Sequence, residues 1–134
     1  MKRIKILFCT ILSVALFVAC APETLLRVAV EDANMECPME VDEMMTITSL
    51  TIEENNVVST CEMDEDKSEH TIEQLDNPEA KSMLKAAFLT HFQTSENNQE
   101  MRELCKKAGY NVVYRFVGTK TGHTLEIVCL ADEL

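Results

Sequence analysis

Two pairs of β-rich runs, set apart by a helical stretch, are the feature that most constrains the fold of this chain. β-Branched and aromatic residues are concentrated in residues 45–52 and 57–63, and again in residues 110–117 and 124–130. A short polar segment joins the two runs of each pair, rich in Glu and Asn in the first pair and flanked by glycine in the second. Short runs joined by such turns are typical of β-hairpins. The sequence therefore predicts two antiparallel hairpins.

The stretch between the hairpins has apolar residues at helical spacing and signals for two helices. The first helix begins at Pro78, which suits the opening turn, and either Asp76 or Asn77 can cap it. The second helix covers residues 95–108 and ends at Gly109, because glycine readily takes the left-handed conformation that closes a helix.

A third helix, over residues 22–36, precedes the first hairpin, and Pro38 ends it. The order of elements is then α-β-β-α-α-β-β. We expect an α+β fold with a four-stranded antiparallel sheet, made from the two hairpins, and with the helices on one face. Residues 20–134 are enough for one such domain.

The first twenty residues have the layout of an export signal. Lys2, Arg3 and Lys5 make a positive start, and residues 6–19 form an uncharged, mostly apolar run of 14 residues. A helix that spans a membrane needs about 20 residues, so this run is too short. It predicts a cleavable signal peptide.

The signal ends in Phe17-Val18-Ala19-Cys20, which resembles the lipobox of bacterial lipoproteins, although Leu is more usual where Phe17 stands. The resemblance implies a signal peptide at residues 1–19 and diacylglyceryl and fatty acyl (palmitate-type) chains on Cys20. Two or more such chains anchor a protein stably to a membrane. We expect a lipid-anchored protein of the cell envelope; an ordinary secretory signal followed by an incidental cysteine is the alternative.

The charge of the mature chain restricts its partners. The whole chain has 12 basic and 23 acidic residues, and removing the three basic residues of the signal leaves 9 against 23, a formal charge of −14. Such an acidic surface argues against binding to nucleic acid and against direct adhesion to anionic lipid. We interpret the acidity as a source of solubility, with a docking surface for a basic partner as the alternative.

Four cysteines remain once Cys20 is assigned to lipid, an even number that suits disulfides in an exported domain. Residue alternation places Cys61 and Cys129 on the core faces of their strands, so we expect them to pair and Cys37 to pair with Cys105. The rival arrangement is Cys37–Cys61 with Cys105–Cys129. Four buried free thiols are the expectation if the protein is not exported.

No motif in the sequence points to catalysis, a metal or a cofactor. The cysteines form no Cys-x-x-Cys pair for thiol redox chemistry, and none lies at zinc-ligand spacing from a partner. His70 lies in an acidic loop, His91 on a helix edge and His123 after a turn glycine. We therefore expect no metal site, no cofactor and no catalytic residue.

The mature chain resembles a group of small exported bacterial proteins that lack an assigned activity. The matching residues are Asn34-x-x-Cys37-Pro38-Met39-x-Val41-Asp42, then Met101-Arg102, Gly109 and Val113-Tyr114. This chain has Cys61 where the second strand of that group usually carries an aromatic residue. The resemblance implies a fold and provides no catalytic residue.

Taken with the signal, these patterns predict a membrane-anchored envelope lipoprotein with a protein-interaction or structural role, bound to the membrane through Cys20 and in contact with another envelope protein. The alternative is a small-ligand-binding or enzymatic envelope protein whose site is assembled from distant residues. A deep pocket with convergent polar groups would favour that alternative.

Overall fold

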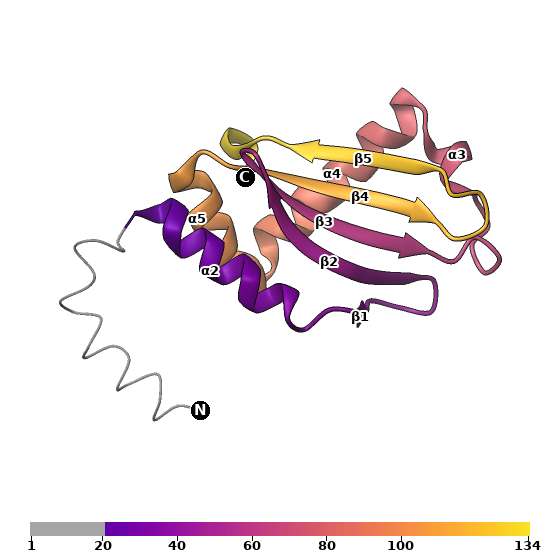
Figure 1. The fold of residues 1–134 in the computed structure, drawn as a ribbon. Helices are drawn as coiled ribbons and strands as arrows, with labels where there is room; N and C mark the ends of the chain where they lie inside the picture. The colour runs from indigo at the N-terminus through magenta and orange to yellow at the C-terminus, as the bar shows by residue number, and fades with distance from the viewer. Residues whose placement is uncertain (1–20) are drawn as a thin grey trace.

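The computed structural model describes residues 21–134, and residues 1–20 lie outside the described part. Helices lie on one side of a twisted five-stranded sheet (Figure 1). The elements, in chain order, are α2 (Pro22–Asn34), β1 (Met39–Glu40), β2 (Met45–Glu53), β3 (Asn56–Met63), α3 (Ile72–Leu75), α4 (Pro78–Thr94), η1 (Glu96–Asn98), α5 (Gln99–Ala108), β4 (Asn111–Gly118), β5 (Thr124–Cys129) and η2 (Ala131–Glu133).

The two predicted hairpins are present. β2 and β3 pair antiparallel around a two-residue turn whose first residue, Glu54, has a left-handed φ of 57°. β4 and β5 also pair antiparallel, with Phe116 opposite Leu125. Both hairpins contribute alternate residues to the core, as the period of two in a strand requires.

The predicted four-stranded antiparallel sheet is wrong. The sheet is mixed, its strand order is β1-β2-β3-β4-β5, and β3 and β4 pair in parallel with Asn56 opposite Asn111. The reason is the helical crossover from residue 64 to residue 110, which returns the chain to the end of the sheet where β3 began. Strands joined by such a crossover run parallel.

Two short elements were also missed, so the observed order is α-β-β-β-α-α-α-β-β. β1 is a two-residue strand in which Met39 pairs with Ile47 of β2. α3 interrupts the segment expected to be a loop, and a capping box fixes its start: Thr71 accepts from the Gln74 amide while the Gln74 side chain accepts from the Thr71 amide.

The predicted start of α4 and the predicted end of α5 are confirmed, whereas α5 begins at Gln99 and not at residue 95, after the 3-10 helix η1. Asn77 caps α4 by accepting from the Ala80 amide at 2.9 Å, and Pro78 occupies the first turn. Gly109 ends α5 with a left-handed φ of 73°. Across residues 21–134, no helix is both long enough and apolar enough to cross a membrane.

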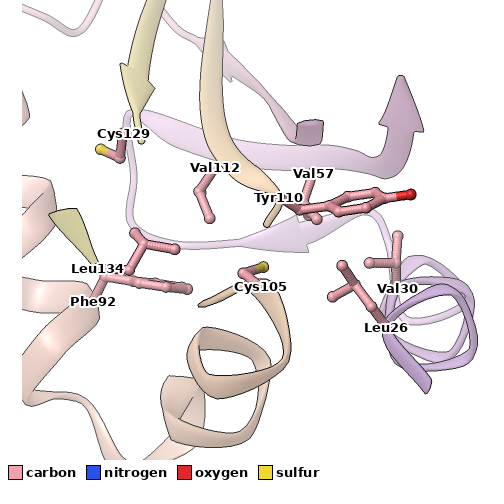
Figure 2. Packing of buried hydrophobic residues seen from close by; sticks show 9 residues of the cluster. All are labelled: Leu26, Val30, Val57, Phe92, Cys105, Tyr110, Val112, Cys129 and Leu134. Atoms are coloured by element: carbon pink, nitrogen blue, oxygen red, sulfur yellow. The ribbon is translucent and has the colours of Figure 1, made fainter. Parts of the chain in front are cut away.

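The core between the sheet and the helices is divided into two clusters. The first joins α2, α5 and the end of α4 to the sheet, and Figure 2 shows its nine buried residues, which are Leu26, Val30, Val57, Phe92, Cys105, Tyr110, Val112, Cys129 and Leu134. The second lies at the other end of the sheet and contains Cys61, Met63, Ile72, Phe116, Leu125 and Ile127. Phe88 of α4 covers that end, with its ring stacked 5.4 Å from the ring of Phe116.

No helix of residues 21–134 lies over the opposite face of the sheet, yet the centre of this face is covered. Arg115 of β4 reaches across β3 to form a bidentate pair with Glu53 of β2, at 2.9 and 3.1 Å, and its Nε contacts Glu126 of β5 at 2.6 Å. Val58 and Val113 are only 2% and 5% exposed on this face. The ion-paired arginine therefore covers the apolar middle of the open face.

Candidate functional site

Cys20, the predicted site of lipid attachment, lies outside the described residues, so its lipidation stays a prediction. The other four cysteines are all described, and each is an unbonded thiol in this structure. Cys61, Cys105 and Cys129 are buried in the core, and Cys37 is half-buried in the link between α2 and β1.

The strand register separates Cys61 from Cys129. Cys61 lies opposite Phe116 of β4, whereas Cys129 lies opposite Val112, four residues away along that strand. At about 3.3 Å per residue the offset alone is ~13 Å, and a disulfide needs Cα atoms within about 7 Å of each other. The structure therefore does not bring this predicted pair together, and oxidation of any pair remains a prediction.

The thiols are poor nucleophiles in this arrangement. Burial raises the pKa of the Cys105 thiol to about 12, and burial also raises the pKa of Cys61 and Cys129. A thiol attacks as its thiolate, so a raised pKa suppresses reactivity near neutral pH. The Ser59 hydroxyl lies 3.8 Å from the Cys61 sulfur, a contact within the core and not a catalytic pair aligned toward solvent.

The three histidines lie in separate segments, before α3, on α4 and in the β4–β5 turn. His70 and His91 are exposed, and His123 contacts Asp76, with Nε2 3.0 Å from the carboxylate, in a link between the β4–β5 turn and the start of α4. Among residues 21–134 there is no group of three or more His, Cys, Asp or Glu side chains that could hold a metal ion.

Glu65 is the most tightly held carboxylate in the described chain, and no pattern in the sequence predicted it. It is 6% exposed and accepts from the backbone amides of Ile72, Lys120 and Thr121 at 2.8–3.0 Å. These donors lower the pKa of Glu65 to about 2, the Thr121 amide most of all. A β-carbon on Gly118 would collide with this carboxylate, so the close approach requires glycine. Glu65 therefore fixes the loop after β3 to the β4–β5 turn.

Several residues of the pattern shared with the small exported proteins have structural tasks. Asn34 Oδ1 accepts from the Leu50 amide of β2 at 2.9 Å, and Asp42 Oδ1 accepts from the amides of Met44 and Met45 to shape the β1–β2 turn. Arg102 donates to the carbonyl of Gln93, which joins α5 to the end of α4. These three residues of the pattern therefore form hydrogen bonds that hold neighbouring elements together.

Two shallow hollows occur on the described surface, and both are open to solvent. One, of about 270 Å³, lies between α2 and β2, with Arg27 and Glu31 on its helical side and Leu50 and Ile52 on its strand side. The other, of about 610 Å³, is formed by Asp42, Glu43, Met44 and Lys67. Neither is the deep, mostly apolar pocket typical of small-molecule sites.

The outer edge of β2 is closed. β1 pairs with β2 at Thr46 and Ile47, and the amides of Val41 and Asp42 donate to the Met45 carbonyl. Further along, Asn34 occupies the outward amide of Leu50. A strand from another protein would find the hydrogen-bonding groups of residues 45–47 and the Leu50 amide already in use at this edge.

The outer edge of β5 is open. The Gly118 amide donates to the carbonyl of His123, the residue opposite it. Because hydrogen-bonded and non-hydrogen-bonded pairs alternate along an antiparallel ladder, every second residue of β5 from His123 bonds to β4. These residues are Leu125, Ile127 and Cys129, whereas the backbone groups of Thr124, Glu126 and Val128 point away from β4. Among the described residues, no hydrogen bond occupies these outward amides and carbonyls. Figure 1 shows β5 as an outer strand of the sheet.

Comparison with known proteins identifies the class of fold. No protein-family model matches the chain, and no curated protein is significantly similar to it. Three solved structures share its fold. A putative secreted protein of Pseudomonas aeruginosa has a TM-score of 0.62 at 12% identity, with 86% of this chain and 94% of that chain covered.

The other two structures are pilotins of type II secretion systems. The pilotin of Vibrio vulnificus has a TM-score of 0.61 at 9% identity and covers 86% of this chain and 93% of its own. The pilotin of Vibrio cholerae has a TM-score of 0.57 at 14% identity and covers 87% and 94%. At these identities the likeness shows a shared fold, one found in a secreted protein and in two pilotins.

Proposed function

We propose that this chain is a lipid-anchored protein of the bacterial envelope that binds another envelope protein, as a pilotin serves a secretion system. The observation that carries this proposal is the fold shared with the two Vibrio pilotins over 86% and 87% of the chain. The export signal that ends at Cys20 supports the location. The mature domain would then work at the membrane to which its first residue is attached.

The described surface supports a protein-binding role over chemistry on a small molecule. The two hollows described above are open to solvent, and the buried thiols have raised pKa values. The Glu65 carboxylate already accepts hydrogen bonds from backbone amides of this chain. An exposed strand edge, by contrast, is a surface that other proteins recognise.

The anchor is tested by comparing two cysteine substitutions within the first twenty residues. Cys20→Ser removes the acceptor of the lipid, whereas Cys9→Ser changes a cysteine inside the apolar run and serves as the matched control. We expect intact mass to show acyl chains on the wild type and on C9S, and membrane fractionation to retain both. An unacylated wild type, or membrane retention of C20S equal to that of the wild type, would contradict the anchor.

The partner is tested by affinity capture of the acylated wild-type protein from its native envelope after chemical cross-linking. We expect one protein component of a secretion system to be enriched over a capture with C20S, which lacks the membrane location. Recovery of a tightly bound small molecule with no specific protein would overturn the proposal in favour of the ligand-binding alternative.

A further inference from the structure

We infer that the open edge of β5 receives an extended segment of the partner protein as an additional strand, with a basic residue beside Glu126 and an apolar residue beside Val128. This inference rests on the proposed function and names the surface and the partner chemistry through which it acts. It is carried by three features of β5, which are its unused backbone groups, its exposed side chains and its charge.

The backbone of β5 provides the hydrogen-bonding pattern of a strand-addition site. Thr124, Glu126 and Val128 each direct an amide and a carbonyl away from β4, and no described residue occupies them. Main-chain hydrogen bonds to such an edge supply affinity, while alternate side chains supply specificity. The six-residue length of β5 accommodates a segment of similar length.

The edge has few of the devices that usually prevent strand pairing. Edge strands are commonly protected by charged side chains, above all lysine, by proline, by a bulge or by a covering segment, and β5 has one charged residue, Glu126. β5 contains neither proline nor lysine, its pairing with β4 has no register shift, and Val128 is 41% exposed. The β2 edge, closed by β1 and Asn34, shows that this same fold does cover an edge elsewhere.

The charges beside the edge select a basic segment. Oε2 of Glu126 accepts from Arg115, whereas no described residue bonds to Oε1. The Glu126 side chain is 46% exposed. On the helix side, Lys85 of α4 is already paired with Glu133 at 2.8 Å. The unsatisfied group beside the edge is therefore a carboxylate oxygen, which a Lys or Arg of an added strand can reach.

A second copy of this chain fits the edge poorly. Antiparallel pairing of two β5 strands about their centre would bring the Glu126 side chains of both copies together, and like charges across a strand pair are destabilising. Each mature chain also has a formal charge of −14, so the copies repel one another. The occupant we infer is therefore a different protein with a basic extended segment.

Site-specific photo-cross-linking in the native envelope tests this inference. A six-residue strand buries less than the roughly 1,200 Å² of a stable interface, so a covalent trap suits it better than co-purification alone. We would place benzoylphenylalanine at position 128 of the full-length acylated protein and, as a matched control, at position 41. Val41 is 56% exposed beside the closed edge, and both positions carry valine.

Two substitutions then test the role of the backbone. Val128→Pro removes an outward amide that the β4–β5 ladder does not use, and proline is tolerated on an edge strand in that position. Val128→Lys keeps the amide but adds a positive charge that opposes a basic segment, and Val41→Lys is its control. Because Val128 is then no longer available for the photoprobe in these variants, the probe is placed at Thr124, which also faces outward.

We expect cross-links from position 128, and few from position 41, to a partner segment that has Lys or Arg within two residues of the cross-linked residue. Val128→Pro and Val128→Lys should each lower the yield from position 124 at least about tenfold, equivalent to 1.4 kcal/mol, while Val41→Lys leaves it unchanged. Unfolding midpoints near that of the wild type would show that the variants are folded.

Equal yields from positions 128 and 41, retention of the cross-link by a folded V128P, or cross-linking to a second copy would each overturn the inference and leave the proposed function standing. If the wild type captures no specific protein from the envelope at all, the proposed function fails and the inference fails with it.

Discussion

The two outer edges of the sheet are treated in opposite ways. At β2 the chain adds a two-residue strand, lays α2 alongside and occupies the Leu50 amide with Asn34. At β5 the outward amides and carbonyls have no partner among the described residues. Natural proteins normally protect exposed edges because they invite pairing with other chains. This contrast, with three devices at one edge and none of them at the other among the described residues, is the basis of our inference that β5 receives a strand.

The difference also has a structural origin in the chain order. β2 lies next in sequence to α2 and β1, which are therefore available to cover it. β5 is followed by the 3-10 helix η2, in which the Glu133 side chain accepts from the Leu130 amide, and no described residue after β5 pairs with its outer edge.

The largest effect should come from undocking α2 from the closed edge. Leu26 is fully buried and its neighbour Leu25 is 41% exposed, so the two leucines make a matched pair on one helix. We expect Leu26→Ala to lower the free energy of unfolding by about 2–5 kcal/mol, through lost burial and the cavity left behind. Leu25→Ala should stay within about 0.5 kcal/mol. Urea unfolding measures both, and equal losses would show that α2 does not depend on this packing.

The next largest loss of stability should come from changing Glu65, which holds the turn of the β4–β5 hairpin. Because folding lowers the pKa of Glu65 to about 2, from about 4.3 in an unfolded chain, its contribution to stability is present above the unfolded value. That contribution is lost as the pH falls from about 4.3 through about 2. We expect Glu65→Gln to be less stable than the wild type at pH 7, with the difference shrinking toward pH 2.

The control for this prediction is Glu69→Gln, which changes an exposed glutamate in the same loop. Thermal unfolding followed from pH 7 to pH 2 compares the three proteins. A parallel pH dependence in wild type and E65Q would refute the role of Glu65. Gly118→Ala provides a second probe, because its β-carbon should displace the carboxylate and reproduce the loss seen in E65Q at pH 7.

A smaller effect is expected at the amide that Asn34 occupies. Asn34→Ala should cost about 0.5–1.5 kcal/mol, the usual net value of a hydrogen bond, and should speed hydrogen exchange at the Leu50 amide. Asn34→Asp keeps an acceptor oxygen and should restore protection. Asp32→Ala, an exposed change on the same helix, is the control. Unchanged exchange at Leu50 in N34A would mean that α2 itself, and not this side chain, closes the edge.

Local patterns in the sequence predicted the longer elements and the pairing within each hairpin, but not the short elements β1 and α3 or the pairing between the hairpins. Asn77, Pro78 and Gly109 act where the sequence placed them, because capping depends on a few neighbouring residues. The parallel contact of β3 with β4 joins residues 55 apart in the chain, Asn56 and Asn111. No local signal distinguishes that pairing from the antiparallel one, since either buries the same alternating face.

The candidate site was hidden from the sequence for the same reason. Whether Val128 lies on an open or a paired edge depends on the strand order, which the predicted antiparallel sheet did not give. Glu65 stands between Asp64 and Asp66 in a segment that looked solvated, and its donors at Lys120 and Thr121 are some 55 residues away. The pattern shared with the small exported proteins included Asn34, but it predicted no role for that residue at the β2 edge.

The smallest effect on stability, and the sharpest on the comparison, should come from Val128→Lys. The side chain is exposed, so the free energy of unfolding should change by less than about 0.5 kcal/mol.

The association experiment uses high salt. At ~1 M salt the Debye length falls to about 3 Å, which screens the repulsion between these acidic chains. Under those conditions we expect light scattering to show self-association of the wild type through its open edge and slower association of V128K. Val41→Lys adds the same charge beside the closed edge and should associate like the wild type. If V41K and V128K slow self-association equally, then net charge and not the open edge governs association. The contrast between the two edges would then have no bearing on binding.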